Sequence, residues 1–162
     1  MNRKLRSVLY VPAINEKAMR KAATLPVDAV VFDLEDSVFP EQKAQARSGL
    51  ADFLSKERTS FQGKYLVIRV NADDTDYWKE DLAVVGQIMP DAVLLPKVTA
   101  PQHIHNTYAE LAAQKDQTPK IWGMVENPLG ILRLESIVEQ GKKSGLECLV
   151  LGTNDLVKDS DI

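Results

Sequence analysis

The chain has 162 residues and a mass of 18.0 kDa, with 44% hydrophobic and 27% charged residues. This composition is typical of one folded globular domain and excludes a disordered or fibrous protein. The 20 basic and 23 acidic residues give a formal net charge of -3, without the concentrated positive charge that nucleic-acid binding requires. We therefore expect a single domain over residues 1–162 and no nucleic-acid partner.

The sequence also indicates where the protein works. No apolar run approaches the roughly 20 residues that span a bilayer, and the N-terminal hydrophobic stretch is too short for a signal peptide. We therefore expect a cytoplasmic protein with no membrane association. The single cysteine, Cys148, cannot form an internal disulfide, and no Cys/His cluster suggests zinc. Any metal site must then be built from carboxylates.

Six short apolar runs, rich in β-branched residues, predict buried strands. They cover residues 7–11, 29–32, 65–68, 92–95, 121–125 and 148–151. The runs start about 28 residues apart on average, which leaves room for one helix between consecutive strands. This spacing is typical of repeated βα units.

Helical patterns fill the intervals between these runs. Two of them show an apolar face at helical spacing, formed by Trp78, Leu82, Val85 and Met89 and by Ile104, Tyr108, Leu111 and Ala112. Prolines at first-turn positions, Pro40 and Pro101, mark two helix starts, the first for a helix over 41–56. Asn127 followed by Pro128 is an N-cap with a proline at the first helical position. We expect these helices to pack on the sheet.

Strict alternation of strands and helices predicts a parallel sheet covered by helices, either an open doubly wound sheet or a closed (β/α)8 barrel. None of the eight glycines forms a Gly-x-Gly pair, so the dinucleotide fingerprint is absent and the barrel is favoured. A complete barrel takes about 250 residues. Only six βα units are present here, so both folds remain open at this point, with the glycine pattern favouring the barrel.

Charged residues follow five of the six predicted strands. In parallel α/β folds the chemistry gathers at the carboxyl ends of the strands. The charged residues at these ends are Asp33, Glu35, Asp36, Arg69, Lys97, Glu126 and Asp155. Acids and bases that share one rim lose solvation unless they pair or bind a ligand. The pattern therefore predicts a polar cleft.

Glu126 and Asp155 are the candidate metal ligands at this rim. Adjacent strands lie about 4.8 Å apart, so carboxylates at neighbouring strand ends can share one cation. Two carboxylates with water and a ligand oxygen suit Mg²⁺, which prefers octahedral oxygen coordination. The alternative is that Glu126 pairs with a basic residue of the rim and Asp155 caps a turn.

Arg69 and Lys97 are the candidate substrate-binding cations. The planar guanidinium of Arg69 suits a carboxylate or phosphate, or else forms a salt bridge with Asp33 or Glu35. Those two acids share one face of their strand, so either could orient Arg69. Lys97 could bind an anion, form an ion pair or, less simply, form a Schiff base.

Other polar features have plain structural interpretations. The spacing predicts that His103 and His105 lie on different helix faces and are exposed. We expect the acidic residues Asp73, Asp74 and Asp76 to lie in a solvated loop. Cys148 reads as a small apolar residue in a buried strand.

Taken together, six strand-end segments resemble a known family. They are RSVLYVP at 6–12, FDLEDSV at 32–38, IRVN at 68–71, LPKV at 95–98, MVE at 124–126 and GTNDL at 152–156. In this order they are similar to the citrate lyase beta subunit and the malyl-CoA lyases of the HpcH/HpaI aldolase/citrate lyase superfamily. The resemblance runs through the whole chain.

The resemblance implies a Mg²⁺-dependent carbon–carbon lyase, usually a homotrimeric (β/α)8 barrel. Such an enzyme cleaves a 3-hydroxyacyl-CoA to acetyl-CoA and a 2-oxo acid such as oxaloacetate, pyruvate or glyoxylate. We therefore expect a TIM-type (β/α)8 barrel of which only the first six βα units are present, as in a fragment of a longer protein. By position, Glu126 and Asp155 resemble the metal ligands, Arg69 the clamp on the oxo-acid carboxylate, and Glu35 and Lys97 residues that line the pocket. The start of the first helix, near Lys17, could meet CoA phosphates. The chain could also belong to a multi-subunit lyase.

Two departures leave other functions open. Asn127-Pro128 stands where relatives commonly carry Thr or Ser, and the last two barrel units are missing together with a C-terminal segment that in several relatives reaches a neighbouring subunit. Strands one and six would then expose unpaired edges. The alternatives are a non-catalytic or truncated subunit that keeps metal and oxo-acid binding, or a metal-dependent aldolase that acts on free hydroxy acids.

Overall fold

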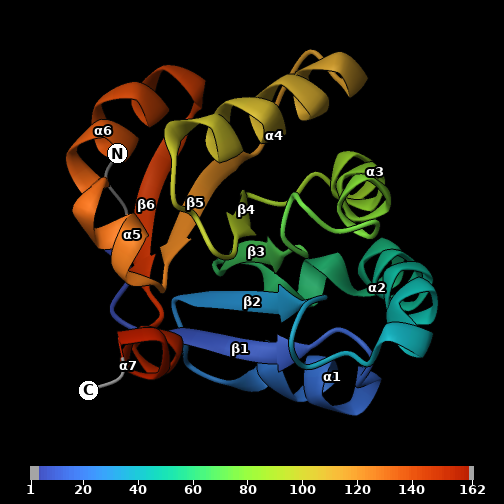
Figure 1. The fold of residues 1–162 in the computed structure, drawn as a ribbon. Helices are drawn as coiled ribbons and strands as arrows, with labels where there is room; N and C mark the ends of the chain where they lie inside the picture. Colours follow the sequence, from blue (N-terminus) through green and yellow to red (C-terminus); the bar gives the residue numbers. More distant parts are fainter. Residues whose placement is uncertain (1–3, 161–162) are drawn as a thin grey trace.

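The sheet follows the sequential order expected of a barrel. In the computed structural model, which describes residues 4–160, six strands lie in the order β1-β2-β3-β4-β5-β6 (Figure 1). Each strand pairs in parallel with the next. The strands are β1 (Val8–Pro12), β2 (Ala29–Asp33), β3 (Tyr65–Arg69), β4 (Ala92–Leu95), β5 (Lys120–Val125) and β6 (Leu146–Leu151). A doubly wound sheet would reverse its order, so the first six βα units of a TIM-type fold are confirmed.

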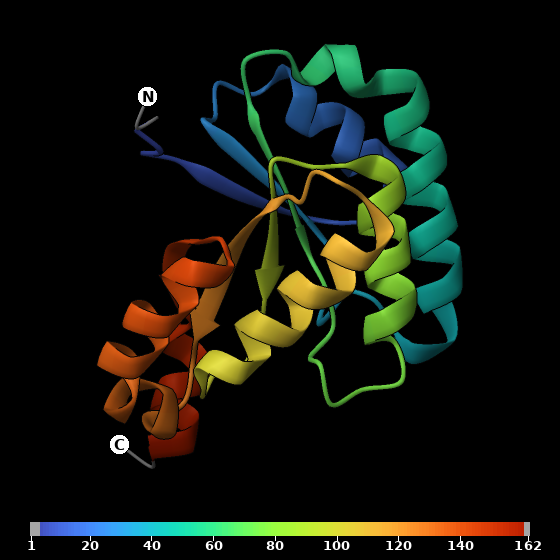
Figure 2. The same cartoon turned by 90° about the horizontal axis from the view of Figure 1, so that it is seen from above.

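Helices alternate with the strands. They are α1 (Glu16–Thr24), α2 (Lys43–Glu57), α3 (Trp78–Ile88), α4 (Pro101–Gln114), α5 (Pro128–Leu132), α6 (Leu134–Gly141) and α7 (Thr153–Ser160), with 3-10 turns at Pro40–Gln42, Arg58–Phe61 and Lys142–Ser144. Seen from above, α2, α3 and α4 lie side by side along the outside of a strongly twisted sheet (Figure 2). Within residues 4–160, every helix is too short or too polar to traverse a lipid bilayer.

The predicted helix starts are largely confirmed. The side chain of Asn127 accepts a hydrogen bond from the Gly130 amide at 2.8 Å, and Pro128 occupies the first turn of α5. Pro101 likewise begins α4. Pro40 instead starts a 3-10 turn, and α2 begins three residues later, at Lys43. The capping signals therefore locate these helices to within three residues.

Two apolar clusters lie on opposite faces of the sheet, as the alternation of side chains along a strand requires. Phe32 and Ile68 point outward and pack with helix residues such as Leu50 and Leu82. Their neighbours point to the inner face, where the buried members are Ala29, Val31, Val67, Ala92, Leu94, Trp122 and Met124. Within the described residues this inner cluster contains strand side chains and no helix side chain. The inner cluster therefore forms the interior of the partial barrel. It extends along the strands toward their carboxyl ends.

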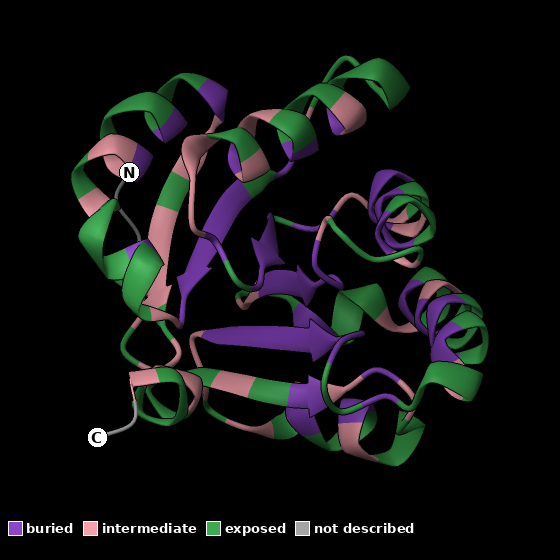
Figure 3. Cartoon of the chain, viewed as in Figure 1, coloured by how far each residue is buried: buried purple, intermediate pink, exposed green. Residues whose placement is uncertain are grey.

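Three sequence expectations need correction. The first and sixth strands were predicted as buried, but β1 and β6 are both half-exposed (Figure 3), because an edge strand has one neighbour. Val8 is 41% exposed and Leu151 is 58% exposed. On α4 the inward residues are Ile104, Thr107 and Leu111, whereas Tyr108 and Ala112 are exposed. Met89 ends α3 in a left-handed conformation with φ 52° instead of extending its apolar face.

We predict that Phe32→Ala lowers the free energy of unfolding by about 3–5 kcal/mol, because it leaves a cavity in the outer core. Phe32 is fully buried, and its ring meets that of Phe61 edge to face at a centroid distance of 5.5 Å. Urea denaturation measures the change, with Phe39→Ala, at an exposed site, as the control. Equal small effects from both variants would show that the packing is wrong.

Candidate functional site

The inner-face pattern of the sheet continues past the apolar cluster into charged side chains. Asp33 lies two residues after Val31, Arg69 two after Val67, and Glu126 two after Met124. Because strand side chains alternate with period two, this spacing directs the charged groups toward the mouth of the barrel. The strands thus place the candidate residues by the same periodicity that builds the core.

Arg69 and Asp33 form a buried, bidentate ion pair at the ends of β3 and β2. The two residues stand opposite each other in the strand register. Arg69 Nε lies 2.7 Å from Asp33 Oδ1, and Nη2 lies 2.7 Å from Oδ2. Burial disfavours ionisation of Asp33, but the guanidinium outweighs it and lowers the pKa of the carboxyl. The ring of Tyr10 faces the guanidinium at 5.6 Å, so Arg69 is held from two sides.

Glu35 lies beside this pair and is only 6% exposed. Its Oε2 is 3.1 Å from Arg69 Nη1 without hydrogen-bond geometry, and its Oε1 is 3.7 Å from Lys97 Nζ. Burial raises the pKa of Glu35 to about 7, with repulsion from Asp36 and Glu126 adding to the effect and the two cations opposing it. The structure therefore brings together Arg69 and both acids that the sequence offered as its partners.

The backbone of Lys97 is turned toward Glu126. Lys97 has φ 55°, in the left-handed region that costs energy for a residue with a side chain. Its amide donates a 2.7 Å hydrogen bond to Glu126 Oε1, while its ammonium is largely exposed. Within the described residues, Glu126 is thus held by the backbone of the neighbouring strand end and not by the side chain of a basic residue.

Glu126 also requires a glycine opposite it. A Cβ atom at Gly152 would lie 2.6 Å from the Cβ and 2.7 Å from the Oε2 of Glu126. Only a glycine allows β6 and the following helix to approach this closely. Burial raises the pKa of Glu126, and the nearby charge of Asp155 raises it further. Asp155 lies in the first turn of α7, not at a strand end as the sequence suggested.

Two cavities open at this rim, with volumes of about 320 and 390 Å³. Glu126, Asp155 and Asp36 line both of them, Arg69 and Tyr10 line the first, and Lys97 lines the second. Within residues 4–160, Asp155 forms no ion pair. The structure therefore places four of the five residues that the sequence assigned to the site around these cavities. The fifth, Glu35, lines neither cavity but contacts Arg69 and Lys97.

The donor set fits a hard cation with incomplete protein coordination. In the described part of the chain, no three His, Cys, Asp or Glu side chains converge on one metal position. Two carboxylates beside an open cavity leave positions for water and a ligand oxygen, which is how Mg²⁺ is commonly bound. The residues present therefore fit Mg²⁺ better than zinc.

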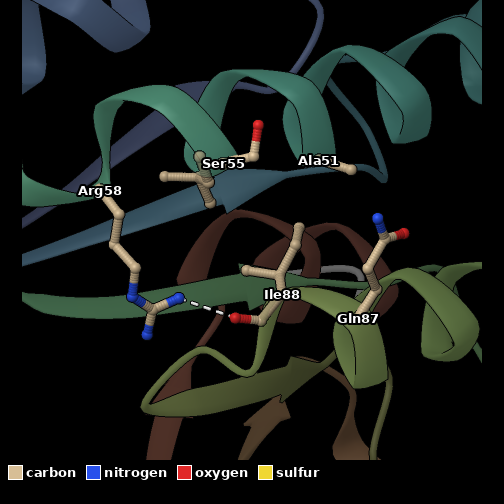
Figure 4. A pocket seen from close by; sticks show the side chains of 6 residues that line it. Ala51, Ser55, Arg58, Gln87 and Ile88 are labelled. Atoms are coloured by element: carbon tan, nitrogen blue, oxygen red, sulfur yellow. Dashed lines mark hydrogen bonds between the residues drawn. The ribbon is translucent and has the colours of Figure 1, made fainter.

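Another cavity, of about 240 Å³, lies between α2 and α3 near their C-terminal ends (Figure 4). Arg58 spans it and donates to the carbonyls of Ile88 and Met89 at 2.7 and 2.8 Å. These bonds satisfy free carbonyls at the end of α3. The contact is thus a helix cap at the end of the helices remote from the strand carboxyl ends.

The two histidines are partnered, contrary to the sequence prediction. His103 Nδ1 lies 2.7 Å from Asp73 Oδ1, and its Nε2 lies 3.2 Å from Thr99 Oγ1. His105 contacts Ser144. Both rings are half-buried, as is Asp73, which was expected in a solvated loop. Contacts between segments about 30 residues apart leave no local sequence signal.

Fold and rim together define an α/β chain of the TIM-barrel type with an acidic site at the strand carboxyl ends. A family model for HpcH/HpaI aldolase/citrate lyase matches residues 6–161. The chain belongs to this family.

Curated relatives and solved structures of this family are similar to the chain. The (3S)-malyl-CoA thioesterase of Cereibacter sphaeroides is 36% identical over 154 residues, which cover 95% of this chain and 50% of that protein. The mitochondrial citramalyl-CoA lyase of Homo sapiens is 31% identical, with 93% and 47% covered. The citrate lyase beta subunit of M. tuberculosis in complex with oxaloacetate and magnesium superposes with a TM-score of 0.73 at 25% identity, with 95% and 60% covered. CitE of Mycobacterium tuberculosis with magnesium, acetoacetate and coenzyme A gives 0.75 at 26% identity, with 95% and 51% covered. The chain spans about half the length of the curated relatives that it matches.

We predict that Glu35→Gln stabilises the protein at high pH. Because the folded-state pKa of Glu35 is raised from 4.5 to about 7, the folded protein binds more protons than the unfolded chain between these values. The wild type therefore loses stability as pH rises through this window. At pH 8 the variant should be more stable by about 3 kcal/mol, and the advantage should vanish near pH 4.5.

Urea denaturation between pH 4.5 and 8 measures the effect. Glu139→Gln, at an exposed position of α6, is the control and should show no pH-dependent difference. A Glu35→Gln effect that does not change with pH would mean that this carboxyl ionises normally.

Proposed function

We propose that this chain carries the metal and oxo-acid site of a Mg²⁺-dependent CoA-ester lyase. The reaction is cleavage of a 3-hydroxyacyl-CoA to acetyl-CoA and a 2-oxo acid such as oxaloacetate, pyruvate or glyoxylate. The observation that carries the proposal is that Glu126 and Asp155 line the same cavities, next to Arg69, in a chain of this family. Relatives described as a citramalyl-CoA lyase and as a citrate lyase beta subunit support the reaction class.

In this proposal Glu126 and Asp155 hold the metal ion. Because the Lys97 amide donates a hydrogen bond to Oε1 of Glu126, Oε2 of Glu126 is the oxygen available to a cation. Mg²⁺, when bound, acts as a Lewis acid toward oxygens that gain negative charge during cleavage. Magnesium in the M. tuberculosis complexes with oxaloacetate, pyruvate and acetoacetate supports this metal.

Arg69 binds the carboxylate of the oxo acid. Asp33 binds Nε and Nη2. Among residues 4–160, Nη1 makes only a 3.3 Å hydrogen bond to Asp36 and the contact with Glu35. Nη1 is therefore the donor that can turn toward a substrate anion. Glu35 and Lys97 line the approach and orient the substrate.

The proposals for the acyl-CoA partner and the assembly rest on the family, whereas the proposal for the location rests on the sequence. A relative complexed with coenzyme A supports a CoA thioester, and we place its phosphates near the exposed Lys17 at the start of α1. We further propose a cytoplasmic homo-oligomer, a trimer or part of a multi-subunit lyase.

A second candidate is hydrolysis of a malyl-CoA-like thioester. The observation that favours it is the 36% identity to a (3S)-malyl-CoA thioesterase. The products distinguish the two reactions, because a lyase releases acetyl-CoA and a 2-oxo acid, whereas a thioesterase releases free CoA and a hydroxy acid. Thiol titration and coupled oxo-acid detection on malyl-CoA and citramalyl-CoA separate them.

We predict that Glu126→Gln weakens Mg²⁺ binding by roughly 10–100-fold, because the variant replaces one of two anionic ligands with a neutral amide. Calorimetric titration with Mg²⁺ in the presence of oxaloacetate measures the affinity. Glu139→Gln, which removes an exposed acid from α6, should bind as the wild type does. Equal binding by both variants would overturn the assignment of Glu126 as a ligand.

We also predict that Gly152→Ala weakens Mg²⁺ binding by at least about tenfold, because the new methyl group displaces the Glu126 carboxylate. Gly49→Ala on α2 is the matched control, since a Cβ there meets no atom within 4 Å, and it should leave binding unchanged. If Gly152→Ala keeps full Mg²⁺ affinity while folding normally, Oε2 of Glu126 is not a metal ligand.

A further inference from the structure

A buried lysine lies behind the acidic segment at residues 33–36, outside the cavities that contain Glu126 and Asp155. Lys43, the first residue of α2, is 6% exposed. Its ammonium donates to Leu34 O, Glu35 O and Asn71 Oδ1, each at 2.7 Å. Three donors meet three acceptors, so the ammonium is fully satisfied.

Such a burial needs a reason, because a charged group that leaves water loses solvation. Burial lowers the pKa of Lys43, although the nearby charges of Asp81, Asp33, Glu35 and Asp36 oppose this shift. An apolar residue would fill the same space at lower cost. An apolar residue, however, cannot donate hydrogen bonds to the two backbone carbonyls of the turn that follows β2.

These carbonyls lie where the strand ladder ends. The Leu34 amide makes the last backbone hydrogen bond to β3, to Arg69 O at 2.9 Å. Beyond this point the chain turns, with the amides of Glu35 and Ser37 donating to Asp33 at 2.9 and 3.1 Å. Lys43 therefore binds carbonyl groups of this turn, and Asp33 binds its amide groups.

A second layer fixes the orientation of the lysine's third partner. Asn71 Nδ2 donates to Leu34 O at 3.0 Å and to Asp81 Oδ2 at 2.6 Å, which directs Oδ1 of its amide at Lys43. Asp81 on α3 is fully buried and pairs with Arg47 on α2 at 3.1 Å. Two helices of the outer layer are thus connected to the ends of β2 and β3.

We propose that Lys43 is a positioning residue, which fixes the backbone of residues 33–36 and so holds Glu35 against Arg69 and Lys97. Glu35 depends on this support, because its Oε2 accepts no hydrogen bond among the described residues. Its side chain is therefore placed by its backbone and by ion-pair contacts alone. The role for catalysis rests on the proposed function, whereas the role in fixing the turn does not.

Hydrogen exchange by NMR tests the turn directly. Lys43→Met keeps a linear side chain of similar length but removes the ammonium. We expect the amides of Glu35 and Ser37 to exchange at least tenfold faster, while core amides such as that of Val67 change much less. Lys56→Met, at an exposed position of the same helix, should leave all amides unchanged.

A uniform change across the whole chain would overturn the proposal, because it would show that Lys43 serves only global stability. Unchanged protection at Glu35 and Ser37 would overturn it too. If Lys43→Met does not fold, Lys43→Gln, which keeps two N–H donors, repeats the comparison.

Steady-state kinetics on the purified protein test the catalytic part. We expect Lys43→Met to lower kcat for cleavage of malyl-CoA or citramalyl-CoA at least tenfold, with KM changed much less, and Lys56→Met to match the wild type. Loss of protection at Glu35 with wild-type kcat would overturn the catalytic role. A wild type without lyase activity would contradict the proposed function, while the exchange result would still decide whether Lys43 fixes the turn.

Discussion

The buried ion pair between Arg69 and Asp33 is the contact on which the rest of the site depends. It joins the carboxyl ends of two adjacent strands at opposed register positions, through two 2.7 Å contacts. Taking two charges out of water is costly, and removing either partner alone would leave the other uncompensated, at about 3–5 kcal/mol. The same pair sets the position of Nη1, around which Glu35 and Asp36 gather.

The rim carries more acidic than basic side chains. Its acidic groups are Asp33, Glu35, Asp36, Glu126, Asp155 and Asp159, and its basic groups are Arg69, Lys97 and Lys158. Burial and mutual repulsion raise the pKa of Glu35 and of Glu126, and such perturbed groups cluster at functional sites. A divalent cation would relieve this repulsion. The apolar interior just below gives the site a rigid support.

Local periodicity predicts the alternating strands and helices and the rim that carries the candidate residues, whereas the choice of a barrel also rests on the resemblance to a known family. Apolar β-branched runs locate the strands, and the residue after each run locates the rim. Other features depend on distant segments. The half-exposed β6 depends on its lack of a second neighbour. Lys43 reaches carbonyls eight and nine residues earlier. Lys97 adopts a left-handed backbone without the Gly or Asn that would indicate it.

The central claim is that Glu126 and Asp155 together bind one divalent ion at the mouth of the barrel. A crystal structure of the protein with Mn²⁺ in place of Mg²⁺ and with pyruvate, phased to show the anomalous signal of manganese, tests it most directly. The account predicts a single peak within about 2.0–2.3 Å of a carboxylate oxygen of each residue. A peak bound by neither carboxylate, or by only one of them, would contradict it.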